Sequence, residues 1–141
     1  MLILWAPDTA ENRRIVEAVS RVFDDLKSPP LVKRATEATV ADITASEIVL
    51  FGVEKTGTTE LPAEFGEWLR VFKGITLAGR TAGFFSMGSE RATARLRRAL
   101  KETEIAQREE DPLFVDSKQG DMTEWARKLI GAHREMKHAR A

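Results

Sequence analysis

The chain has 141 residues, an ordinary length for one folded domain, and 43% of them are hydrophobic, enough to form a packed core. Its 22 lysine and arginine residues balance 22 aspartate and glutamate residues, so no net charge draws it to nucleic acid or an anionic membrane. The absence of cysteine excludes disulfides, thiol catalysis and cysteine-ligated clusters. The first apolar run has only four residues, too few for a signal peptide or a membrane span, so we expect a cytoplasmic protein.

Short apolar runs alternate with longer amphipathic segments along the whole chain. Strands are expected at 2–6, 31–35, 47–53 and 81–85, with an interrupted last strand within 105–117. Helices are expected at 9–27, 36–45 and 121–136, with one more opened by Pro62 and another capped by Ser89. The segment EIVLFGV (47–53) is apolar throughout, which is typical of a central strand covered on both faces.

This order of elements predicts a single α/β domain over residues 1–141, with a basic C-terminal tail at about 133–141. Its core is a doubly wound parallel sheet of five strands with helices on both faces and right-handed crossovers. In such sheets a ligand binds in the crevice at the carboxyl ends of the strands. The loops at the carboxyl ends of the strands are therefore the places to look for a site.

Those loops, together with the length and element order, resemble the short-chain flavodoxins. The resemblance is carried by APDTAEN (6–12), by EIVLFGV (47–53) with the loop after it, and by GRTAGFFSMGS (79–89). The segments EIAQREEDPLFVD (104–116) and EWARKLIGAH (124–133) also resemble the last strand and helix of that family. The resemblance implies a flavodoxin-like fold with strand order 2-1-3-4-5. It further implies FMN as cofactor and electron transfer to a redox partner protein, a carrier's role more than an enzyme's.

The phosphate loop of that family falls on residues 7–12, where Thr9 matches the pattern outright. The resemblance implies that the phosphate is held by Thr9, Ala10, Asn12 and Arg13, through hydroxyl, amide and free backbone N–H groups at a helix start. Asp8 and Glu11, however, are spaced like a capping box, in which Asp8 accepts the N–H groups that a phosphate needs. The stretch is thus open to two interpretations, a self-capped helix start or a phosphate loop.

The two remaining loops would flank the flavin ring. The resemblance places Thr56 and Gly57 on one side, and Ser86, Met87 and Gly88 on the other. Neither loop carries an aromatic side chain for stacking, and Trp5, just before the first loop, is either a core residue or a wall of the crevice. The alternative hypothesis is a degenerate flavodoxin-like domain that binds no flavin and acts as a protein-interaction or regulatory module.

A row of arginines follows the third loop. Arg91, Arg95 and Arg98 recur at helical spacing on one side of the predicted helix. They form either a docking patch for an acidic partner or a solvated face paired with neighbouring acids. His133 and His138 are five residues apart, which is not the spacing of a helical metal-binding pair, so the sequence assigns no metal site and no catalytic residue.

Overall fold

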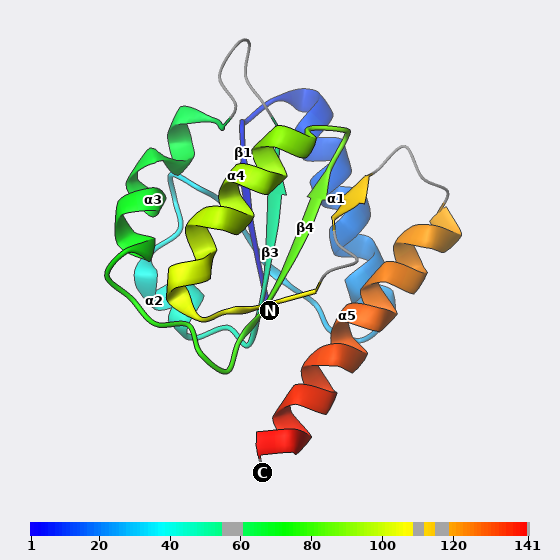
Figure 1. Cartoon of the computed structure of the whole chain (residues 1–141). Coiled ribbons are helices and arrows are strands. Elements are labelled where there is room, and N and C mark those ends of the chain that lie inside the picture. Colours follow the sequence, from blue (N-terminus) through cyan, green and yellow to red (C-terminus); the bar gives the residue numbers. More distant parts are fainter. Residues whose placement is uncertain (55–60, 109–111, 115–118, 141) are drawn as a thin grey trace.

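The computed structural model describes residues 1–54, 61–108, 112–114 and 119–140, in which strands and helices alternate (Figure 1). The strands are β1 (Leu2–Ala6), β2 (Leu31–Arg34), β3 (Ile48–Val53), β4 (Thr81–Ser86), β5 (Ala106–Gln107) and β6 (Leu113–Phe114). The α-helices are α1 (Ala10–Asp25), α2 (Val40–Thr44), α3 (Gly66–Phe72), α4 (Glu90–Leu100) and α5 (Gln119–Arg140). Two 3-10 turns, η1 (Ala63–Phe65) and η2 (Lys101–Thr103), precede α3 and follow α4.

The strands form one parallel sheet in the order β2-β1-β3-β4-β5, which confirms the predicted fold. In β1, Leu2 lies beside Leu31 of β2 on one side and beside Val49 of β3 on the other. The interrupted last strand is present as two pieces, with β5 beside the start of β4 and β6 beside its end. Because the strands are parallel, the loops after β1, β3 and β4 emerge at the same edge of the sheet.

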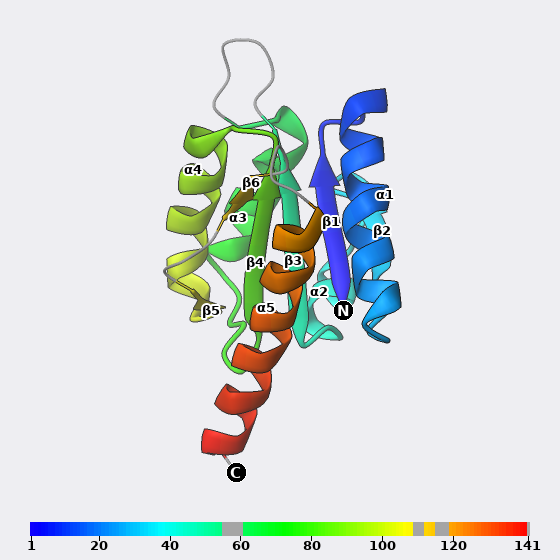
Figure 2. The same ribbon diagram turned by 90° about the vertical axis from the view of Figure 1, so that its right-hand side faces the viewer.

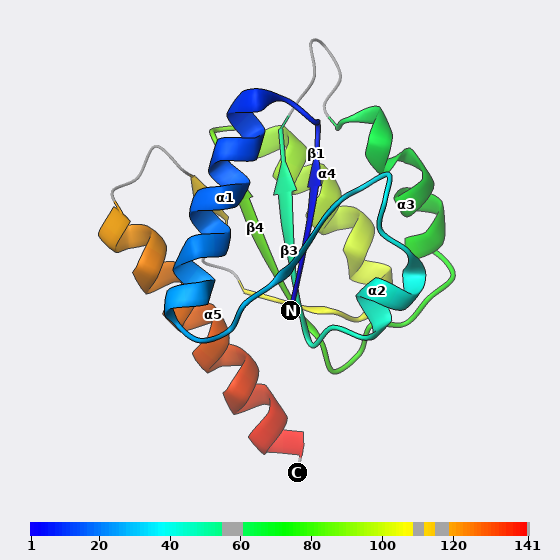
Figure 3. The ribbon, with the colours of Figure 1, turned by 180° about the vertical axis from the view of Figure 1, so that it is seen from behind.

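Helices cover both faces of the sheet (Figure 2). Successive residues of β1 alternate between two cores: Ile3 and Trp5 pack with α1 and α5, whereas Leu4 packs with α2, α3 and α4. Seen from behind, α1 and α5 lie side by side, with the ring centroids of Phe23 and Trp125 5.9 Å apart (Figure 3). Burial on both faces is the reason that β3 is apolar throughout.

Helix α2 is shorter than the sequence predicts, because its N-terminus is set by a capping box. Thr39 is the N-cap, and its hydroxyl oxygen accepts the Asp42 N–H at 3.2 Å. The Asp42 carboxylate in turn accepts the Thr39 N–H at 2.8 Å. The helix therefore begins at Val40, and a turn at residues 35–37 precedes it.

Helix α5 is longer than predicted and continues through most of the basic segment expected as a tail. Its last turns extend past the start of the strands (Figures 1 and 2). His133 anchors this part: its ring is 5% exposed, and Nδ1 lies 2.8 Å from the Thr81 hydroxyl. Lys137 forms an ion pair with Glu47, which also lies beside the His133 ring. None of the described helices is both long and apolar enough to cross a membrane.

Candidate functional site

The loop between β1 and α1 supplies the first part of the site at the carboxyl edge of the sheet. It follows a cis Ala6–Pro7 peptide bond, and Thr9 is the N-cap of α1. The Thr9 hydroxyl oxygen accepts the Asn12 N–H at 3.1 Å. Asn12 is 2% exposed, and its side-chain amide donates to the Pro7 carbonyl at 2.9 Å beneath the loop. The Asn12 amide thus fixes the loop and does not face outward as a donor.

Asp8 does not cap the helix, so the capping box expected of Asp8 and Glu11 is wrong. Both oxygens of the Asp8 carboxylate accept hydrogen bonds from the Arg13 guanidinium, at 2.6 and 2.9 Å. One of them also accepts a hydrogen bond from Arg34, at the end of β2, at 2.9 Å. Hydrogen bonding from Arg13, with the nearby positive charge of Arg34, lowers the pKa of the Asp8 carboxyl. The helix start is capped one residue later, by Thr9, because the first helical residue is Ala10.

This arrangement leaves two backbone donors at the start of α1. The Thr9 N–H donates to the Pro7 carbonyl, and the Asn12 N–H is taken by the Thr9 hydroxyl. The N–H groups of Ala10 and Glu11 have no acceptor among the described residues. Two free N–H groups at the positive end of a helix are suited to an anion such as a phosphate.

Glu54 connects the end of β3 with the loop after β4. Its Oε1 accepts the Ser86 hydroxyl at 2.9 Å and also the Met87 N–H, and its Oε2 accepts the Ser89 hydroxyl at 2.8 Å. Its own N–H donates to the Ala6 carbonyl at 3.2 Å, so Glu54 also contacts β1. The Glu54 carboxylate thereby joins the end of β3 to the loop after β4, and its backbone N–H adds a bond to β1.

The loop after β4 takes its shape from Ser86 and Gly88. The Ser86 hydroxyl oxygen accepts the N–H groups of Gly88 and Ser89, at 3.2 and 2.8 Å. Gly88 has a φ of +148°, which side-chain-bearing residues rarely adopt. Ser89 is the N-cap of α4, as expected, but its hydroxyl donates to Glu54 and makes no bond to the helix. Met87 is 43% exposed and faces solvent beside these groups.

Six of the nine predicted binding residues lie at this edge of the sheet, at the start of α1 or at the end of β4 and in the loop after it: Thr9, Ala10, Arg13, Ser86, Met87 and Gly88. Asn12 lies there too, buried beneath the first loop. Thr56 and Gly57 lie outside the described residues. Trp5 is 7% exposed and packs in the core between the sheet, α1 and α5, so it belongs to the core and does not wall the crevice.

Glu54 is the residue whose role sequence reasoning missed. The sequence does show an acid directly after a buried strand, and two serines three residues apart after the next. Only the adjacency of β3 and β4 makes those groups meet. In the part of the chain that the structure describes, no group of three or more histidine, aspartate or glutamate side chains could hold a metal ion.

The exposed face of α4 carries the predicted arginine row. Arg91, Arg95 and Arg98 are all exposed, and none forms an ion pair with a described residue. A hollow of about 250 Å³ lies between α3 and α4, and its lining includes Arg95, Arg98, Lys73 and Glu102. The positive charge of this face is thus available to a partner molecule.

No protein-family model and no curated protein sequence matches the chain. The chain does match solved structures in its fold. A short-chain flavodoxin associated with a non-canonical PDU bacterial microcompartment matches with a TM-score of 0.76 at 17% identity, covering 94% of this chain and 99% of that one. Fusobacterium nucleatum flavodoxin bound to flavin mononucleotide matches with a TM-score of 0.74 at 12% identity, over 92% and 96% of the two chains. A Streptococcus pneumoniae TIGR4 flavodoxin matches with a TM-score of 0.71 at 19% identity, covering 92% of this chain and 97% of that one. The fold of the chain is therefore that of the flavodoxins.

Proposed function

We propose that the chain binds FMN at the carboxyl edge of the sheet and carries electrons. The observation that carries this proposal is the pair of N–H groups of Ala10 and Glu11 at the start of α1, beside the Thr9 hydroxyl, for which the described residues provide no acceptor. The fold match to an FMN-bound flavodoxin over almost the whole chain gives that anion site its proposed ligand.

The charges around the first loop suit a phosphate better than the sequence suggests. Asp8 is the acid that would repel a phosphate most directly, and its charge is offset by Arg13 and Arg34. The Arg13 side chain is 61% exposed and keeps N–H groups beyond the two bonded to Asp8. We infer that the backbone N–H groups hold the phosphate and that Arg13 supplies the neighbouring positive charge.

The second loop would bind the flavin ring. FMN would supply the redox chemistry, and the protein would position the ring and limit its contact with water. The exposed Met87 thioether is a polarizable, apolar contact for a ring, and Gly88 leaves the backbone without a side chain beside it. Glu54 fixes this loop from below through Ser86 and Ser89.

A second candidate function is favoured by that same glutamate. Glu54 already accepts the Met87 N–H and both serine hydroxyls, so the loop after β4 offers fewer free donors to a flavin. In this alternative the domain binds no flavin and acts as an interaction module. In both cases Arg91, Arg95 and Arg98 form the surface for an acidic partner, which would be the redox partner if FMN binds.

The proposal is tested by titrating the purified protein with FMN while following the quenching of flavin fluorescence. We expect saturable one-to-one binding. Asp8→Asn should bind FMN about fivefold more tightly, because a negative charge beside the phosphate is removed and two guanidinium groups are released. Asp25→Asn makes the same charge change at the other end of α1 and should leave the affinity unchanged. Absence of binding at 100-fold excess of FMN over about 1 μM protein would favour the interaction module.

A further inference from the structure

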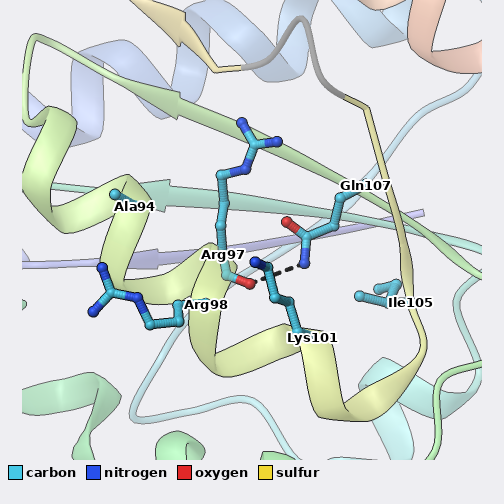
Figure 4. A pocket seen from close by; sticks show the side chains of 6 residues that line it. All are labelled: Ala94, Arg97, Arg98, Lys101, Ile105 and Gln107. Carbon is cyan, nitrogen blue, oxygen red and sulfur yellow. Dashed lines mark hydrogen bonds between the residues drawn. The ribbon is translucent and has the colours of Figure 1, made fainter.

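A cavity of about 710 Å³ lies on the flank of the sheet, away from the site just described (Figure 4). It is formed by the C-terminal half of α4, η2 and β5. Its lining residues are Ala94, Arg97, Arg98, Lys101, Ile105 and Gln107. Because β5 pairs with Thr81 and Ala82, the cavity lies toward the amino-terminal end of β4, whereas the candidate FMN site lies at the carboxyl end.

Positive charge is concentrated at this cavity. Of the six lining residues that the structure describes, three are cations and none is an acid. Arg98 and Lys101 are exposed, and neither forms an ion pair with any residue that the structure describes. In a chain whose net charge is zero, such a concentration of positive charge at one hollow is a local feature of the surface.

Arg97 is the fixed member of the cluster. Its guanidinium lies 5.6 Å from the centre of the Phe84 ring and donates to the Arg108 carbonyl at 2.8 Å. Gln107 reaches across from β5, and its amide donates to the Arg97 carbonyl at 3.0 Å, a bond drawn in Figure 4. These contacts join α4 to the edge strand, so that the cavity has one preformed charged wall.

The rest of the lining is suited to the body of an organic molecule. Ala94 and Ile105 supply apolar surface, and the Gln107 amide retains a second N–H group as a donor. Ligand cavities typically measure about 300–1,000 Å³ and combine apolar walls with a few polar groups. A single inorganic ion would leave most of this volume unfilled.

We propose that this cavity binds a small organic anion with two or more negative charges, of the phosphate-ester or polycarboxylate class. Arg98 and Lys101 supply the charge that recognises the anion, and Arg97 forms the wall beside them. Arginine and lysine pair with phosphates and carboxylates alike, so the structure defines the shared chemistry of the ligand. Cations in the last turn of a helix also interact favourably with the helix dipole, and a test must separate that role from ligand binding.

The test is a titration with pyrophosphate and, separately, with citrate, followed by backbone amide chemical shifts and by calorimetry. We expect millimolar or tighter binding, with shifts concentrated in residues 94–107. Arg98→Ala combined with Lys101→Ala should weaken binding about twentyfold, since each exposed charge contributes up to about fivefold. Arg21→Ala combined with Arg91→Ala removes the same charge from exposed positions outside the cavity and should change the affinity less than twofold.

The outcomes separate the sources of the ligand and the roles of the cations. Binding of pyrophosphate alone identifies a phosphate ester, and binding of both probes identifies a polyanion site of wider specificity. Equal weakening by both double variants, shifts centred on residues 8–13, or no binding at 10 mM of either probe would each overturn the proposal. The double variant of Arg98 and Lys101 should bind FMN like the wild type, so this inference and the proposed function fail independently.

Discussion

The hydrogen-bond network of Glu54 gives the sharpest prediction about how the site is held together. Glu54→Gln keeps the shape of the side chain but removes its charge from three accepted hydrogen bonds. The amide group that replaces Oε2 donates where a carboxylate oxygen accepts, and the Ser89 hydroxyl must turn to accommodate it. We therefore expect a less stable protein with a less ordered loop between β4 and α4.

The magnitude follows from the number and type of these bonds. A hydrogen bond to a charged group contributes about 1.5–3 kcal/mol to stability, and one between neutral groups contributes about 0.5–1.5 kcal/mol. Removing the charge therefore weakens each of the three bonds by about 1 kcal/mol. Glu54 is only partly buried, so hydrogen bonds to water compensate for part of this loss. We therefore expect the free energy of unfolding to decrease by about 2 kcal/mol. For a chain of this length that corresponds to a fall in Tm of about 7 °C.

The assay is urea unfolding followed by tryptophan fluorescence, together with a thermal scan by circular dichroism. Glu135→Gln is the matched control, since Glu135 is exposed on α5 and has no hydrogen bond or ion pair with a described residue. It should unfold within about 0.5 kcal/mol of the wild type. If Glu54→Gln is as stable as Glu135→Gln, the carboxylate does not hold the loop after β4 to the end of β3, and our reasoning about the loop is refuted.

Three further changes test the fold around the site. Gly88→Ala should destabilise the protein by about 1 kcal/mol or more in urea unfolding, because an alanine backbone is strained at a φ of +148°. Gly74→Ala, at a position without such a φ, should not destabilise it in the same assay. Burial lowers the pKa of His133 in the folded protein, so as the pH falls the imidazole is protonated in the unfolded chain before it is protonated in the folded one. The free energy of unfolding should therefore decrease as the pH drops below about 6.5. His133→Leu should flatten that part of the curve of Tm against pH. Trp68→Phe removes a buried 2.7 Å hydrogen bond to the Ala35 carbonyl and should cost about 1–3 kcal/mol in urea unfolding.

The sheet could be predicted from the sequence because its signals are local. The central strands β1 and β3 are short apolar runs, and helices α1, α3, α4 and α5 show a stripe of apolar residues at helical spacing. The sequence predicts a helix at residues 9–27, and α1 runs from Ala10 to Asp25. It predicts the end of the last helix at residue 136, four residues too early, because the anchors that extend α5, His133 on Thr81 and Lys137 on Glu47, join residues more than 50 positions apart.

The site could be predicted only in outline, because its polar contacts are between distant parts of the chain. Local spacing made Asp8 a helix cap, but Arg34, 26 residues away, lies on the neighbouring strand and competes for the carboxylate. The Glu54 network likewise depends on β3 and β4 being adjacent. Positions of loops followed from the topology, whereas the partners of each charged group required the fold.

The most direct test of the account is to compare the affinities of FMN and riboflavin for the wild-type protein in the same fluorescence titration. The two ligands differ only in the phosphate, which we assign to the N–H groups of Ala10 and Glu11 and the Thr9 hydroxyl. We expect FMN to bind at least tenfold more tightly than riboflavin, the contribution of one charge-assisted hydrogen bond or more. Equal affinities, or no binding of FMN, would contradict the claim that the start of α1 is a phosphate site.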